Sequence, residues 1–123
     1  MTVLLIDTSG ERAQVAILED VNVVAHYVWE NTPYVGPQIL EHIEAAFQEA
    51  GISWDRIDRI AAHRGPRKDK LFFSGLRTGI ATAMLLASAK QKELVELTGD
   101  SLEEMVATAG IAATQYIISP RYE

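Results

Sequence analysis

The stretch MTVLLIDTSGERAQVAILEDVNVVAHYVWE, residues 1–30, contains three apolar runs separated by short polar sequences. The runs cover residues 3–6, 14–18 and 21–29, and the third is rich in β-branched and aromatic residues. Runs of this length bounded by turn-forming residues are typical of β-strands. Parallel strands need a long crossover between them, and these connections are too short for one. We therefore predict an antiparallel meander of three strands.

A helical pattern replaces the strand pattern after residue 36. Between Pro37 and Ala50 the apolar residues recur every three or four positions, which predicts a helix with one apolar side. Gly51 is placed to end it. The apolar residues of this helix are Ile39, Leu40, Ile43, Ala46 and Phe47.

A second long helix is predicted at about 75–89, after a short strand at 57–62. Its apolar residues lie all round the helix, so it must be covered on two sides. The sheet of the same chain can cover one side. The other side needs a second surface, and we expect that surface to belong to another protein.

The remaining elements complete an alternating order. We predict a strand at 93–98, a helix that begins with Ser101 and Glu104 in a capping box, and a last short strand at 116–119. Three antiparallel strands followed by alternating helices and strands predict an α/β fold with a mixed five-stranded sheet and helices on its faces. This order is that of a single ribonuclease H-like (actin-like ATPase) lobe.

Composition limits the classes of function. The 123 residues suit one domain, and the absence of cysteine excludes disulfides, thiol catalysis and Cys-ligated zinc. No apolar run is long enough to span a bilayer, so we expect a cytoplasmic protein without membrane contact. With 17 acidic and 11 basic side chains the net charge is −6, so contact with nucleic acid is expected only through a partner. The one local basic cluster is Arg64, Arg67, Lys68 and Lys70.

Several motifs occur in the order and spacing of one family. The chain resembles the TsaB/YeaZ-type dimerisation subunit of the tRNA threonylcarbamoyladenosine synthase, in the actin/hexokinase/Hsp70-like superfamily. The resemblance covers residues 3 to about 109. Each motif is weak by itself, and the order and spacing of the motifs together make the resemblance specific. They are LIDTS (5–9), VAIL (15–18), the segment 39–61, GP (65–66) followed by SGLRTGIATA (74–83), and DSLE (100–103).

The resemblance implies a non-catalytic subunit that dimerises through its two long helices. The partner would be the related catalytic threonylcarbamoyltransferase subunit, or a second copy in a homodimer. It implies no cofactor held by the chain itself, and it leaves room for a nucleotide shared with partner subunits. Residues 1–123 would form one amino-terminal lobe, with a second lobe absent or truncated after about 115. The expected partner-binding residues, on the outward side of the helices, are Ile39, Ile43, Phe47, Arg77, Ile80, Met84 and Leu85.

Two interpretations apply to the turn formed by Asp7, Thr8 and Ser9. Phosphotransferases of this superfamily use an acidic residue at this position to organise Mg²⁺ and phosphate, so the turn is a candidate vestigial phosphate or metal site. The alternative, which we favour, is that Asp7 accepts hydrogen bonds from the turn that follows it. No catalytic residue and no metal site are predicted, because His26, His42 and His63 fall on different elements.

Two other functions fit the same sequence. One is the amino-terminal lobe of an ATP-dependent kinase of the same superfamily, which would bind ATP and Mg²⁺ through Asp7. The other is a degenerate homodimeric protein with a role unrelated to tRNA.

Overall fold

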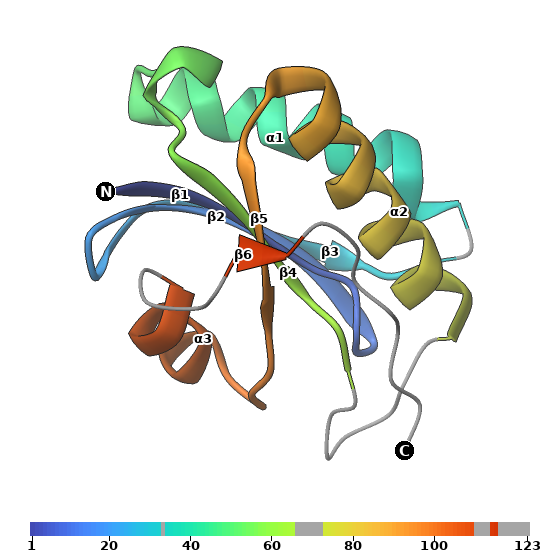
Figure 1. Ribbon diagram of the computed structural model, residues 1–123. Helices are drawn as coiled ribbons and strands as arrows, with labels where there is room; N and C mark the ends of the chain where they lie inside the picture. Colours follow the sequence, from blue (N-terminus) through green and yellow to red (C-terminus); the bar gives the residue numbers. More distant parts are fainter. Residues whose placement is uncertain (33, 66–72, 110–113, 116–123) are drawn as a thin grey trace.

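A computed structural model describes residues 1–32, 34–65, 73–109 and 114–115 of the chain (Figure 1). The predicted strand at 116–119 and the basic residues Arg67, Lys68 and Lys70 lie outside the described residues. The elements are β1 (Thr2–Asp7), β2 (Arg12–Glu19), β3 (Asn22–Glu30), α1 (Val35–Ala50), the 3-10 turn η1 (Trp54–Arg56), β4 (Arg59–His63), α2 (Phe73–Lys90), β5 (Glu93–Leu97), α3 (Leu102–Ala109) and β6 (Thr114–Gln115).

The strands form one mixed sheet in the order β3-β2-β1-β4-β5-β6. The predicted meander is confirmed, because β1 pairs antiparallel with β2 and β2 pairs antiparallel with β3. Strands β1, β4 and β5 run parallel to one another. The sheet therefore contains the five strands predicted up to residue 98 and a sixth, β6, which is two residues long and antiparallel to β5.

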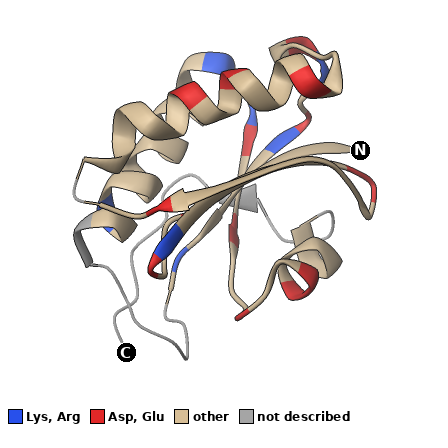
Figure 2. Cartoon of the chain, turned by 180° about the vertical axis from the view of Figure 1, so that it is seen from behind, with Lys and Arg blue, Asp and Glu red and all other residues tan. Residues whose placement is uncertain are grey.

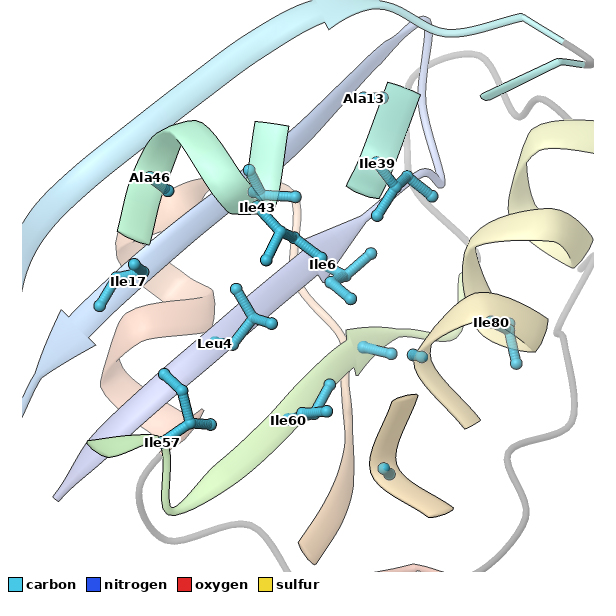
Figure 3. Packing of buried hydrophobic residues seen from close by; sticks show 14 of the residues in the cluster. Leu4, Ile6, Ala13, Ile17, Ile39, Ile43, Ala46, Ile57, Ile60 and Ile80 are labelled. Atoms are coloured by element: carbon cyan, nitrogen blue, oxygen red, sulfur yellow. The ribbon is translucent and has the colours of Figure 1, made fainter. Parts of the chain in front are cut away.

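Helices cover both faces of the sheet, with α1 and α2 on one face and α3 on the other (Figure 1). Strand β1 is buried along its whole length because it lies inside the sheet between β2 and β4. Its alternate side chains enter different cores. Leu4 and Ile6 pack beneath Ile39 and Ile43 of α1 (Figure 3), whereas Val3 and Leu5 belong to the cluster that α3 covers.

The helix ends follow the local sequence. Helix α1 begins at Val35, two residues before the predicted start, because Pro37 still lies in the first turn, where an amide hydrogen has no intrahelical partner. Gly51 ends it in the left-handed conformation, with φ of 67°. At α3 the Ser101 Oγ accepts the Glu104 amide at 3.2 Å, as predicted. The Glu104 carboxylate reaches one residue further back than a capping box requires and accepts the Asp100 amide.

Charged side chains are distributed unevenly over the helices. Figure 2 shows acidic residues on α1 and α3, whereas α2 carries only Arg77 and Lys90. Within the described part of the chain, none of the helices combines the length and the apolar character that a membrane span requires.

Candidate functional site

The turn at the carboxyl end of β1 is organised by the buried carboxylate of Asp7. Its Oδ1 accepts the Ser9 amide at 2.9 Å and also the Ser9 hydroxyl. Its Oδ2 accepts Nε2 of Gln14 at 2.8 Å. The reading in which Asp7 accepts hydrogen bonds from the following turn is therefore confirmed. The sequence could not reveal Gln14 as a partner, because that contact depends on the register of Asp7 opposite Gln14.

A hydrogen-bonded row extends from Asp7 across three strands. Gln14 donates to Asp7 through its amide nitrogen, so its Oε1 is an acceptor and the Nε2–H of His26 donates to it at 2.8 Å. Partial burial lowers the pKa of His26, because the charged imidazolium loses hydration there. His26 is thus favoured in its neutral form, with the proton on Nε2.

Asn31 fixes the same turn from the other side. Its Nδ2 donates to the carbonyl oxygens of Thr8 and Gly10, both at 2.9 Å. Asn31 is buried, and sequence analysis did not single it out. The available signal was a polar residue directly after an apolar strand, which is too common to be diagnostic.

Helix α2 packs directly against this turn because two of its residues lack side chains. A Cβ atom at Gly75 would overlap the amide group of Asn31, and one at Gly79 would overlap the side chain of Thr8. The glycines of the GLRTG motif therefore serve close packing. The buried Thr8 Oγ1 and Asn31 Oδ1 have no hydrogen-bond partner among the described residues.

The three histidines lie apart, as predicted. His63, at the end of β4, is held by two backbone groups of neighbouring loops. His42, on α1, stacks on Trp29 with ring centroids 3.9 Å apart. Within the residues that the structure describes, no three His, Cys, Asp or Glu side chains are grouped closely enough to hold a metal ion.

Four of the expected partner-binding residues do not lie on the outward side, and that expectation is wrong for them. The side chains of Ile39, Ile43, Phe47 and Ile80 are buried in the core between the helices and the sheet. The apolar stripe of α1 faces its own sheet, because that surface is large enough to bury it.

The outward side of this helical layer, here called the α1–α2 surface, consists of other residues. Leu85 is 70% exposed and Leu40 is 50% exposed, and Arg77 and Ala81 are also exposed. Met84 is half-buried against the core. Between Thr78 and Ala89 no residue is charged. This surface is therefore apolar along most of α2, with a single cation near the start of the helix.

Comparison with known proteins identifies the family. The sequence pattern of the family described as "TsaD: tRNA N6-adenosine threonylcarbamoyltransferase" matches residues 37–119. The chain belongs to this family. It is also 32% identical to the tRNA N6-adenosine threonylcarbamoyltransferase of Syntrophobacter fumaroxidans, in a match that covers 77% of this chain and 32% of that protein.

Solved structures place the chain at the YeaZ-like branch of the actin/hexokinase-like fold. YeaZ from Pseudomonas aeruginosa superimposes with a TM-score of 0.68 and 28% identity, over 79% of this chain and 43% of YeaZ. A hexokinase of the ROK type from Thermus thermophilus superimposes with a TM-score of 0.55 and 19% identity, over 80% and 35% of the two chains, which shows the fold alone. This TsaD-family chain spans about a third of the length of the Syntrophobacter fumaroxidans protein and less than half of the length of YeaZ.

Proposed function

We propose that the chain is a dimerising subunit in the threonylcarbamoyl modification of tRNA, and that it does not carry out the transfer itself. Membership of the TsaD family supports the connection with this modification. The likeness to YeaZ supports the subunit role. The resemblance to the TsaB/YeaZ type implies that this chain pairs with the catalytic subunit.

The observation that carries the proposal is the exposed apolar side of α2. Leu85 is 70% exposed and lies within a run of twelve uncharged residues, 78–89, so the outward side of α2 carries no charge over this length. Fully burying one leucine side chain contributes about 2 kcal/mol. A helix pair docked on Ala81 and Leu85 would remove this apolar area from water.

The same surface can bind either of two related partners. Equivalent helices of the catalytic threonylcarbamoyltransferase subunit would give a heterodimer, in which Arg77 at the edge faces a carboxylate of the partner. A second copy would give an isologous dimer, in which Leu85 of each chain lies near the two-fold axis. We place the catalytic subunit first, because the resemblance to the TsaB/YeaZ type implies that partner.

The hydrogen bonds of the Asp7 carboxylate support a non-catalytic role. Both carboxylate oxygens accept hydrogen bonds from Ser9 and Gln14 of the same chain. A nucleotide would then be held together with partner subunits rather than by this turn alone, and tRNA would be bound mainly by the partner.

Sedimentation velocity and co-purification with the transferase subunit of the same organism test the proposal. We expect a dimer or a heterodimer from the wild-type chain, and loss of association in Leu85→Asp. Val21→Asp is the matched control, because Val21 is also 70% exposed but lies in the β2–β3 turn. A wild-type chain that stays monomeric and fails to co-purify would contradict the proposal, as would equal effects of the two substitutions.

A further inference from the structure

Strand β3 forms a long open edge of the sheet. It is the outermost strand, and no strand among the described residues pairs with its outer side. It is nine residues long and contains neither lysine nor proline, the residues by which edge strands usually avoid pairing with another chain. The register shifts between Ile17 and Leu18, which leaves Val24 as a bulge near the start of β3. Beyond the bulge, residues 25–30 form a regular edge.

One backbone hydrogen bond shows which groups of β3 face outward. The amide of Asn31 donates to the carbonyl oxygen of Glu11 at 3.0 Å, in continuation of the β2–β3 register. Along an antiparallel strand, residues that bond to the partner alternate with residues that do not. Residues 25, 27 and 29 therefore bond to β2. The amide and carbonyl groups of His26, Val28 and Glu30 point away from the sheet and can pair with a further strand.

The side chains of this edge are complementary to those of a second copy. In an antiparallel pairing about a two-fold axis at Val28, this 43% exposed residue meets Val28 of the second copy. His26 then lies opposite Glu30 of the second copy, so a basic side chain meets an acidic one. On the α1 side of the sheet Tyr27 lies opposite Trp29 of the second copy, which gives an aromatic cross-strand pair. Each of these contacts occurs twice because of the symmetry.

The other two-fold registers are less favourable. An axis at His26 would place two imidazoles opposite each other, and an axis at Glu30 would place two carboxylates opposite each other, which is destabilising. An axis at Tyr27 would bring Glu30 opposite the bulge at Val24. Only the axis at Val28 keeps the whole pairing of residues 26–30 within the regular part of the edge and without like groups opposite each other at its polar positions.

Two copies of α1 fit side by side in this arrangement. Helix α1 packs on β2 and β3. The α1 helices of two paired copies are therefore two strand spacings apart, about 10 Å, and helices ordinarily pack at about 8–10 Å. The side of α1 next to the outer edge of β3 carries His42, which stacks on Trp29. Helical spacing places Gln38 and Ala45 beside His42, and neither carries a charge.

We propose that β3 pairs antiparallel with β3 of a second copy about a two-fold axis at Val28, which joins the two sheets into one. The contact is small, so we expect a Kd of about 0.1 mM, weaker than docking on the α1–α2 surface. The two surfaces are separate. A catalytic subunit docked on the α1–α2 surface of each copy would therefore give a closed assembly of four chains, in which the β3 pairing is strengthened by linkage.

A single introduced thiol tests the pairing, because the chain has no cysteine. In Val28→Cys the two thiols meet at the axis. In the control Val23→Cys, at a 41% exposed position of the same strand, they lie about 30 Å apart. With a short bis-maleimide and protein near the expected Kd, Val28→Cys should form the covalent dimer at least about tenfold faster than Val23→Cys. Equal rates would overturn the proposal. So would loss of the difference when Leu85→Asp is added, because the α1–α2 surface would then be responsible.

Amide hydrogen exchange measured by NMR gives an independent readout on the wild-type chain. When the protein concentration rises from about 0.05 to about 1 mM, the amides of residues 26, 28 and 30 should become protected, whereas those of 25, 27 and 29 should be protected throughout. Val28→Pro removes the central outward amide, which the fold itself does not use, and should abolish the change at residues 26 and 30. Val28→Lys, which places two cations at the axis, should do the same. Protection in both variants equal to that of the wild type would overturn the proposal.

Discussion

The imidazole of His63 donates from Nε2 to the carbonyl oxygen of Gly99, at 2.7 Å, and so ties the end of β4 to the loop that follows β5. Its Nδ1 accepts the amide of Gly65 at 2.8 Å. Gly65 and Gly99 both have positive φ, of 70° and 131°. One buried side chain therefore holds two glycine turns in place at the carboxyl ends of neighbouring parallel strands.

His63→Ala should destabilise the chain strongly. The substitution leaves the buried amide of Gly65 and the partly buried carbonyl of Gly99 without partners, and it opens a cavity. We expect the free energy of unfolding to fall by about 3 kcal/mol. Urea denaturation followed by circular dichroism measures this, with His26→Ala, at a much less buried position than His63, as the control. Equal effects of the two substitutions would contradict the structural role of His63.

Gly79→Ala should lower stability although alanine is the better helix former. A methyl group at Gly79 overlaps Thr8, and we expect a net loss of about 2 kcal/mol. Thr8→Ala should recover part of the loss when the two substitutions are combined. A double-mutant cycle measures this coupling. Gly36→Ala is the matched control, because its Cβ would meet only the Thr78 methyl at 3.2 Å. Purely additive effects would show that α2 does not rest on the turn.

Asp7→Ala should weaken the fold without removing a nucleotide site. The amide of Ser9 and the side chain of Gln14 lose their acceptor, which costs about 2 kcal/mol. Isothermal titration of the wild-type chain with ATP and Mg²⁺ should give no saturable heat. Tight binding that Asp7→Ala abolishes would instead favour the amino-terminal lobe of an ATP-dependent kinase.

The stability of the chain should depend on pH through His26. Burial lowers its pKa in the folded state below the ordinary value of 6.5. The unfolded chain therefore takes up this proton at a higher pH than the folded chain does. The free energy of unfolding should fall as the pH drops through the ordinary pKa of histidine.

Other groups of the chain also titrate. The contribution of His26 is therefore measured by comparing the pH dependence of the free energy of unfolding in the wild type and in His26→Gln. A glutamine can still donate to Gln14 but carries no titrating proton. Urea denaturation above and below the ordinary histidine pKa should show a smaller loss of stability in the variant. An identical pH dependence in the two proteins would mean that His26 is hydrated in the fold.

Sequence patterns predicted most of the architecture, because the elements differ in local periodicity. The meander followed from short connections, and α1 followed from the spacing of Ile39, Ile43 and Phe47. The orientation of α2 could not be predicted in the same way. Its apolar residues surround the helix, so the sequence alone could not tell that Ile80 faces the sheet and Leu85 faces water.

The hydrogen-bonded parts of the candidate site were also beyond sequence reasoning. Asp7 was predicted correctly because it bonds to Ser9, two residues away. Gln14 and Asn31 contact the turn, and His26 contacts Gln14. These contacts depend on strand register and chain reversal, which link positions far apart in the sequence.

The direct contact of Gly79 with Thr8 has a mechanical consequence. Long side chains between a helix and its support can absorb small displacements by changing rotamer. Here only the short, β-branched side chain of Thr8 lies between Gly79 and the turn. A shift of the β1–β2 turn should therefore move α2 with it. That movement would displace the contact surface of a protein docked on Leu85.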